Sequence, residues 1–498
     1  MLIFALDVIN VFLLVISNKL SIFMSKGYAN ISLSVKAAFW FVFCTLLQKA
    51  FSFVTVPIFT RIMSSDQYGL FNLYNAWLGI IVVLCTMNME SGVFVNGYVK
   101  EDIKEKRNEL PISLLSLSFT LTAIIFTLLF FVYICNSSLI SLPISFLVLM
   151  FIEVIANPVL RIWTVEQRFR YKYKLLVLIT LILVFTQILL GIYFVYNADS
   201  YNKAYVRIFW NVIPILILGL MIYMYYIRRS HRVFLISNWI QILKLQMPLV
   251  PYNLSMVLLL SSSRILIGKY DGTKSVAIYS VAYSIGQIIS MIKQSIVDGF
   301  HPWIYDKLKK KEFEPLQKMI SVLQLLLATL AFLVSSLAPD LVRLFAPIEY
   351  YEAVYIVPFV SAIVIFALFN QVFVIIETYY EKTKNIMYSS IVACVLNIIL
   401  NIILIPSLGY LIAGFTSLLS YMILSYINYY CICKISAFKN PFTWNVIYVT
   451  PIILSTIVSF VAFLYKYPFI LRGISFCIIM ICMLKWHKII QIFKEKKI

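Results

Sequence analysis

Charged residues are scarce in this chain, and no long polar stretch separates its apolar segments. Asp, Glu, Lys and Arg make up 12% of the 498 residues, and 62% of the residues are hydrophobic. Soluble globular domains carry about a quarter charged residues and roughly half apolar ones. This composition excludes a soluble globule and leaves no room for a soluble domain. We therefore expect one all-α integral membrane domain with many spanning helices.

The residues that usually mark catalytic or metal sites are also few. The eight cysteines form no pair of CxxC motifs, and His231, His301 and His487 are isolated from one another. The chain contains no Gly-x4-Gly-Lys-Ser/Thr, no Gly-x-Ser-x-Gly and no His-Glu-x-x-His sequence. We therefore expect a transporter rather than an enzyme, and no cofactor and no metal. The net charge of +20 is spread over short connections, so nucleic acid is not an expected partner.

What the chain does contain is a long series of apolar segments, each near the ~20 residues that a bilayer core requires. We predict fourteen helices in all. They cover residues 36–58, 67–95, 110–134, 139–164, 175–197, 204–227, 243–267, 275–299, 316–338, 353–379, 386–405, 409–433, 443–465 and 468–486.

The basic residues between these segments predict the orientation. Twenty-nine Lys and Arg lie on the side that holds Lys100, Arg229 and Lys310, and eight lie on the other side. By the positive-inside rule the first side is cytoplasmic, and both termini lie there. Residues 1–23 allow three interpretations: a signal peptide, an uncleaved extra segment, or a true start at Met24. A signal peptide has its positive charge before the apolar run, whereas here the charge follows it, and we favour the start at Met24.

A faint internal repeat divides the chain near Arg232. Residues 61–71 have a counterpart at 264–279, and Glu166 to Arg170 are echoed by Glu381 to Lys384. We therefore predict an N-terminal extension at 1–35, an N-lobe of six helices at 36–232 and a C-lobe of six helices at 233–434. Residues 435–498 would add two further helices and a basic tail. Repeats of this kind place a substrate site between the halves, near the midplane.

Polar residues recur at helical spacing on several predicted helices. An ionisable group in a membrane helix costs about 2.5 kcal/mol or more at the bilayer centre, so it normally faces a cavity or a partner. For Lys49, Glu153 and Arg264 we favour a cavity, with Lys293 intermediate. For Arg61, Asp298 and Glu377, near helix ends, we favour pairing or snorkelling. The repeated polar sets are Thr45, Gln48, Lys49, Ser52 and Thr55; Asn75, Thr86 and Glu90; Glu153, Asn157 and Arg161; Tyr283, Gln287, Ser290, Gln294 and Asp298; and Asn370, Glu377 and Glu381.

Two stretches resemble a known family. The first apolar helix with Pro57 and Arg61, followed by Tyr68-Gly69-Leu70-Phe71, resembles the opening of the bacterial oligosaccharide flippases. These are the Wzx-type, O-antigen members of the multidrug/oligosaccharidyl-lipid/polysaccharide exporter superfamily. The segment from Leu396 to Gly414, with two Asn and Pro406, resembles the late helix pair of the family. The resemblance covers most of residues 31–430. The sequence departs from it at Ser263, where the family often has an acidic residue.

The resemblance implies a MATE-like fold and a flippase that works by alternating access. Its substrate would be an undecaprenyl-diphosphate-linked oligosaccharide repeat unit, moved from the cytoplasmic to the periplasmic leaflet of the bacterial inner membrane for O-antigen, lipopolysaccharide or capsule synthesis. Membrane lipid, a polysaccharide polymerase and a chain-length regulator would be partners. Lys49, Arg264, Lys293, Glu153 and Arg161 would line the cavity, the first three as cations that attract the diphosphate. Glu153 and Glu90 are the candidates for ion coupling.

Two alternatives accompany this prediction. A cation-coupled multidrug exporter of the same superfamily usually has twelve helices and an acidic cavity, which disfavours it. A polysaccharide polymerase or ligase would need a large external loop. The longest external connection here, at about residues 339–352, is too short to build an active site, and such an enzyme leaves the internal repeat unexplained.

Overall fold

The computed structural model describes residues 33–90, 92–94, 104–136, 141–236, 239–435, 445–465 and 474. Within these ranges all regular structure is helical, and thirteen helices are long and apolar enough to cross a membrane. They confirm thirteen of the predicted segments. The fourteenth predicted helix, at 468–486, lies outside the described residues except for residue 474. The proposed start at Met24 and most of the predicted extension also lie outside them.

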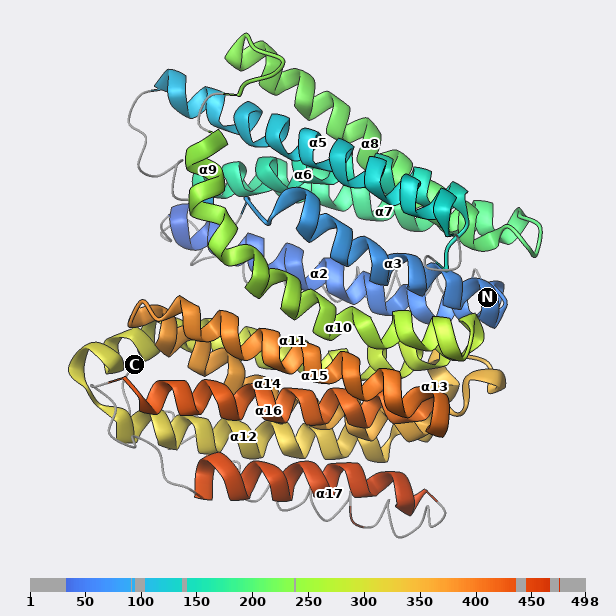
Figure 1. Cartoon of the computed structure of the whole chain (residues 1–498), viewed down its shortest axis with the longest axis vertical. Helices are drawn as coiled ribbons and strands as arrows, with labels where there is room; N and C mark the ends of the chain where they lie inside the picture. Colours follow the sequence, from blue (N-terminus) through green and yellow to red (C-terminus); the bar gives the residue numbers. More distant parts are fainter. Residues whose placement is uncertain are drawn as a thin grey trace, which may run out of the picture.

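The helices divide into two bundles (Figure 1). The N-lobe comprises α2 (Leu33–Ile62), α3 (Ser65–Thr86), α5 (Lys104–Cys135), α6 (Ile144–Phe169), α7 (Tyr173–Asn197) and α8 (Lys203–Ser230). The C-lobe comprises α10 (Val250–Tyr270), α11 (Thr273–Lys310), α12 (Phe313–Ser336), α14 (Ala353–Tyr379), α15 (Thr383–Leu408) and α16 (Ala413–Cys433). Short elements connect or precede these helices: α9 (Trp239–Gln246), η3 (Met247–Leu249), α13 (Ala338–Phe345), η4 (Ile348–Tyr350), η5 (Tyr410–Ile412) and η6 (Asn445–Val449). The last described helix, α17 (Thr450–Leu464), packs on α12 and α14.

The second predicted helix ends earlier than expected. Met87 and Asn88 adopt left-handed backbone conformations with φ of 51° and 53°, so α3 stops at Thr86. The Thr86 hydroxyl accepts a hydrogen bond from the Asn88 amide at 3.2 Å and stabilises this turn. The placement of Glu90 on one helical face with Asn75 and Thr86 was therefore wrong, because Glu90 follows the end of the helix.

The seventh predicted helix is broken at its beginning. Pro248 and Pro251 lack the backbone N–H that continues a helical ladder, and the chain passes from α9 through the 3₁₀ turn η3 into α10. The α9 segment packs on α5 of the N-lobe, whereas α10 packs on both α3 and α15. This span therefore connects the two lobes along its length (Figure 1).

The internal repeat is visible in how equivalent helices end. Tyr171 after α6 and Glu381 after α14 both adopt positive φ, of 54° and 56°. In each case the next residue donates to a carbonyl five positions back, Lys172 to Gln167 at 3.0 Å and Lys382 to Glu377 at 2.8 Å. The sequence repeat matched Glu166 with Glu381. The shared cap instead makes Tyr171 the structural counterpart of Glu381, so the structural repeat is aligned differently from the sequence repeat.

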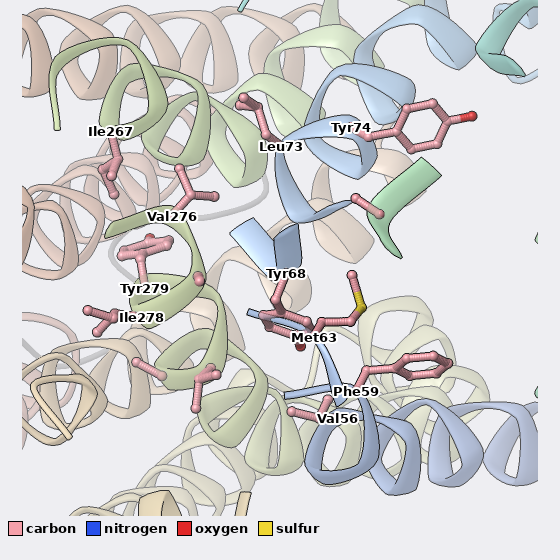
Figure 2. Close-up of a cluster of buried hydrophobic side chains, with 14 of the residues drawn as sticks. Val56, Phe59, Met63, Tyr68, Leu73, Tyr74, Ile267, Val276, Ile278 and Tyr279 are labelled. Carbon is pink, nitrogen blue, oxygen red and sulfur yellow. The ribbon is translucent and has the colours of Figure 1, made fainter. Parts of the chain in front are cut away.

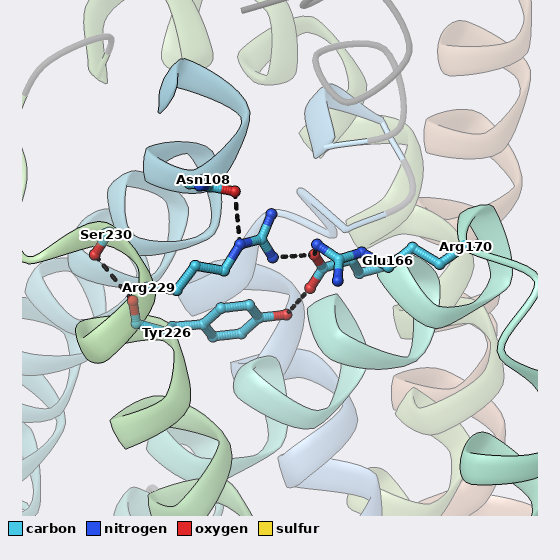
Figure 3. A network of polar contacts seen from close by, with 6 residues as sticks. All are labelled: Asn108, Glu166, Arg170, Tyr226, Arg229 and Ser230. Carbon is cyan, nitrogen blue, oxygen red and sulfur yellow. Dashed lines mark hydrogen bonds and ion pairs between the residues drawn. The ribbon is translucent and has the colours of Figure 1, made fainter. Parts of the chain in front are cut away.

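A buried carboxylate ties the N-lobe together at the end where α6 and α8 finish (Figure 3). Glu166 is fully buried and forms ion pairs with Arg229 of α8 and, at 2.7 Å, with Arg170. The Tyr226 hydroxyl donates to the same carboxylate at 2.8 Å, and Arg229 Nε donates to Asn108 of α5 at 2.6 Å. Three helices are thus joined through one satisfied charge cluster.

The two lobes share a hydrophobic core at the end that carries α13, which we call the α13 end. Val56, Phe59 and Tyr68 of the N-lobe belong to the same buried cluster as Val276 and Tyr279 of the C-lobe (Figure 2). We call the opposite end, where α6, α8, α11 and α14 finish near their Lys and Arg residues, the basic end. The lobes are therefore packed against each other at the α13 end.

Candidate functional site

Two adjoining cavities lie between the lobes. The larger, which we call the C-lobe cavity, has a volume of about 770 Å³ and is lined by α2, α10, α11, α14 and α16. The smaller, the N-lobe cavity, has a volume of about 460 Å³ and is lined mainly by α2, α3, α7 and α8. Ser52, Val56 and Ser284 line both cavities, so the two spaces meet at α2 and α11.

Three predicted cations come together in the C-lobe cavity. Lys49 of α2, Arg264 of α10 and Lys293 of α11 all line it. They meet because each helix turns a polar stripe toward the same space: Lys49 and Ser52 on α2, and Tyr283, Gln287, Ser290 and Gln294 on α11, repeat at helical spacing. Lys49 and Lys293 lie within electrostatic range of each other.

The Arg264 guanidinium is held by an aromatic ring rather than by an acid. Its central carbon lies 4.4 Å from the ring centroid of Tyr283, and its Nε is buried without a hydrogen-bond partner. A cation placed over a tyrosine face is stabilised by the ring quadrupole but keeps its full charge. Arg264 therefore presents an unneutralised charge to the cavity.

The other predicted site residues lie elsewhere. Glu153 is buried in α6 and accepts a hydrogen bond from the Tyr74 hydroxyl at 2.7 Å. Arg161 forms an ion pair with Glu90 at 2.9 Å. None of these three is among the residues that line the two cavities. Glu153 and Arg161 meet partners of the N-lobe, and sequence spacing alone could not distinguish this from a helical face turned toward the cavity.

Arg207 is a cavity residue that the sequence reasoning missed, because it was counted among the cations of a connection. It lies in the first turns of α8 and lines the N-lobe cavity. Its guanidinium carbon is 3.6 Å from the ring centroids of both Phe59 and Phe71. The signal that could have revealed it is the spacing of Arg207 and Asn211, one helical turn apart, since both line this cavity.

Among the described residues, the lining of both cavities contains four cations and no carboxylate. Elsewhere among the described residues Arg161, Arg229 and Arg232 are all paired with Glu side chains. None of the four cavity cations forms an ion pair with a described carboxylate, although Asp298, which accepts a hydrogen bond from Gln294 at 2.8 Å, lies near Lys293. Because charge in a low-dielectric surround favours an opposite charge strongly, this space is suited to an anionic guest.

The α13 end of the cavities is closed by hydrogen bonds between the lobes. The Thr60 hydroxyl donates to the carbonyl of Phe345 at 2.7 Å, and Arg61 donates to the carbonyls of Arg343 and Leu344 at 3.1 and 2.9 Å. Both groups of acceptors are on or next to α13. The pairing expected for Arg61 from its place near a helix end therefore occurs, and it holds α2 to the C-lobe.

A second contact of the same kind joins the turns that the sequence repeat had matched. Thr273 at the start of α11 donates to the carboxylate of Asp66 at the start of α3, at 2.8 Å. Ser65 also contacts Glu349 at 3.4 Å. The α2–α3 turn thus rests on the α10–α11 turn and on the segment after α13.

A buried polar cluster joins α10, α15 and α16 and reaches the C-lobe cavity through Ser417, whose hydroxyl lies 3.3 Å from that of Ser263. Ser262 donates to Asn397 at 2.8 Å, and Asn401 donates to Ser263 at 3.0 Å. The Thr416 hydroxyl donates to Asn401 at 2.5 Å. Ser263, where the family that the sequence resembles often has an acidic residue, is thus part of a neutral, hydrogen-bonded cluster that connects three helices.

Comparison with protein families agrees with this architecture. A family model described as "Polysaccharide biosynthesis protein" matches residues 34–306, more than half of the chain, and a model described as "MatE" matches residues 248–403. Comparison with curated protein sequences gives no match.

Solved membrane transporters share the fold at low sequence identity. An inward-facing multidrug resistance MATE family transporter of the MOP superfamily has a TM-score of 0.60 at 13% identity, over 82% of this chain and 95% of the other. The lipid II flippase MurJ in an inward closed conformation has a TM-score of 0.64 at 14% identity, over 90% and 99%. A MATE protein in complex with MaL6 has a TM-score of 0.53 at 13% identity, over 85% and 96%. The chain therefore belongs to the polysaccharide biosynthesis protein family and has the multi-pass fold of the MOP-superfamily transporters and flippases.

Proposed function

We propose that this protein is a flippase for an undecaprenyl-diphosphate-linked oligosaccharide repeat unit, and that it supplies a surface polysaccharide pathway. The observation that carries the proposal is the charge of the two cavities: of the residues that the structure describes, four cations and no carboxylate line them. A diphosphate is held chiefly by electrostatics and by charge-assisted hydrogen bonds, and Lys and Arg supply both.

Lys49, Arg264 and Lys293 form the diphosphate site in this proposal. They come from both lobes, since Lys49 is on α2 and the other two are on α10 and α11. A ligand that contacts both lobes can favour one arrangement of the lobes over another only if its contacts differ between the two arrangements. A site shared by the lobes meets this requirement, because a movement of one lobe changes which cations reach the ligand.

The orientation follows from the distribution of charge. Under the positive-inside rule the basic end faces the cytoplasm of a bacterial inner membrane and the α13 end faces the periplasm. The hydrogen bonds of Thr60, Arg61 and Thr273 then close the periplasmic side. Release of the substrate to the periplasmic leaflet requires these contacts to break. Glu153 remains a candidate for coupling to an ion, as a buried carboxylate hydrogen-bonded to Tyr74, whereas Glu90 is committed to its pair with Arg161.

A cation-coupled multidrug exporter is the second candidate, because MATE transporters share the fold. Cationic drugs are attracted by carboxylates, and the cavity lining offers cations instead. The chemistry of the cavity therefore favours the lipid diphosphate over a cationic drug.

Complementation of surface-polysaccharide display in a flippase-deficient strain tests the proposal. At matched membrane levels, Lys49→Ala and Arg264→Ala should each reduce display by about tenfold or more, because a hydrogen bond to a charged group contributes about 1.5–3 kcal/mol. Lys49→Arg and Arg264→Lys should retain most of it, since the charge stays. Normal display by both alanine variants would show that these cations are structural and that the proposed site is wrong.

A further inference from the structure

The N-lobe cavity differs from the C-lobe cavity in its charge, since one described cation lines it instead of three. Its lining combines amides and hydroxyls with aromatic rings and one cation, Arg207. The polar members are Gln48, Ser52, Thr55, Asn72, Gln187, Asn211 and Ser284, and the aromatic members are Phe51, Phe59, Tyr68 and Phe71. Amides pair with hydroxyl groups as both donors and acceptors, and rings cover the apolar faces of a sugar. Both cavities offer such groups to a glycan, but the C-lobe cavity also gathers three cations that suit a diphosphate, which leaves the N-lobe cavity for the glycan.

The Arg207 guanidinium is packed against the faces of two aromatic rings. The ring centroids of Phe59 and Phe71 each lie 3.6 Å from its central carbon. Tyr68 adds a third ring at 5.6 Å. Three of the surrounding residues, Phe59, Met63 and Tyr68, are seen together in Figure 2. The stacked faces leave the N–H edge of the guanidinium as the part available to a ligand.

That edge has no acidic partner among the residues that the structure describes. Its only hydrogen-bond contact there is from Nη1 to the sulfur of Met63, at 3.9 Å. A thioether is a weak acceptor, and it does not neutralise the charge. A pre-oriented guanidinium edge of this kind matches a carboxylate, which accepts two parallel hydrogen bonds from it.

We propose that the N-lobe cavity holds the glycan of the lipid-linked substrate and that Arg207 selects a repeat unit with an acidic, uronate-type sugar. The inference rests on the proposed function, since it divides the substrate of that function between the two cavities. The lipid-side diphosphate lies with Lys49, Arg264 and Lys293. The carboxylate of the sugar meets the Arg207 edge, and the amides of Gln48 and Asn211, which line the same cavity, are available to its hydroxyls.

The alternative for Arg207 is that it helps to hold the diphosphate. The two assignments predict different effects of substituting Arg207. Every donor of this class carries a diphosphate, so if Arg207 binds it, the substitution lowers the transport of all donors alike. Only acidic donors carry a carboxylate, so if Arg207 binds it, the substitution removes the preference for acidic over neutral donors.

The test uses the full chain reconstituted in proteoliposomes with two undecaprenyl-diphosphate-linked disaccharides. The donors are identical except that one ends in glucose and the other in glucuronate. The wild-type protein should translocate the glucuronate donor at least about tenfold faster than the glucose donor, because only the glucuronate carboxylate can form a charge-assisted bidentate contact with Arg207. Arg207→Gln should bring the two donors to the same rate, and Arg207→Lys should keep part of the preference because the charge remains without the planar fork. Arg161→Gln, which alters a cation outside both cavities, should keep the full preference.

Equal rates for the two donors in the wild-type protein would overturn the inference, and this comparison needs no variant to fold. If Arg207→Gln lowers the translocation rates of both donors by the same factor, the inference is also overturned, and Arg207 is assigned to the diphosphate. If the wild-type protein moves neither donor faster than protein-free vesicles do, the proposed function itself fails, and the inference fails with it.

Discussion

Gly69 of α3 lies directly against the main chain of Thr273 at the start of α11. A Cβ atom added at Gly69 would be 1.8 Å from the Thr273 carbonyl oxygen, which is too close for two non-bonded atoms. The neighbouring hydrogen bond from Thr273 to Asp66 fixes the same two turns to each other. The closed α13 end therefore depends on the absence of a side chain at one position.

We expect Gly69→Ala to separate the lobes at the α13 end. The added methyl meets backbone rather than a flexible side chain, so overpacking should destabilise the closed interface by about 1–3 kcal/mol. In a background without the native cysteines, a single cysteine at Ser65 should become more reactive toward a membrane-impermeant maleimide. Gly299→Ala is the matched control, since a Cβ there has no atom within 4 Å. Unchanged reactivity in Gly69→Ala would contradict the tight contact.

Glu166→Gln should destabilise the N-lobe without altering the cavities. The carboxylate is fully buried with Arg229 and Arg170, and neutralising it leaves two cations without their charge partner. Breaking such a pair costs about 3–5 kcal/mol. Thermal unfolding of the purified protein should show a clear fall in the midpoint. Glu314→Gln, which alters the exposed pair with Lys318, should change the midpoint little. Equal midpoints for the two variants would show that the buried network is not stabilising.

The proposed orientation predicts the outcome of reporter fusions. Fusions at the basic end should report a cytoplasmic position, and fusions at the α13 end a periplasmic one, because Lys and Arg are retained on the cytoplasmic side. The cytoplasmic set comprises fusions after Lys100, Arg229, Lys310 and Lys439, and the periplasmic set comprises fusions after Asn136, Asp271 and Asp340. A consistent inversion would place the closed end of the structure in the cytoplasm and refute the assignment.

The sequence predicted the parts of the site that depend on helix periodicity. Lys49 and Ser52 on one helix, and Gln287 and Gln294 on another, indicated polar faces, and the structure places these residues in the lining of one cavity. Such faces could be recognised because a polar stripe in an otherwise apolar helix must meet something other than lipid.

The sequence could not predict what each polar face meets. Glu153 has the same kind of spacing as Lys49, yet it is bonded to Tyr74 inside the N-lobe. Arg207 lies so near the start of its helix that charge counting placed it in a connection, whereas Phe59 and Phe71 hold it in the cavity. Glu90 was assigned to a helix that ends at Thr86, because nothing in the sequence shows the left-handed turn at Met87. Each of these depends on a partner from a distant part of the chain.

The most direct test of the central claim is a comparison of two lipids in proteoliposomes. One carries an oligosaccharide on undecaprenyl diphosphate, and the other carries the same oligosaccharide on undecaprenol through a neutral ether. If the cavity cations bind the diphosphate, the wild-type protein should translocate the first lipid at least about tenfold faster, and Lys49→Ala combined with Arg264→Ala should remove that difference. Equal rates for the two lipids in the wild-type protein would contradict the account.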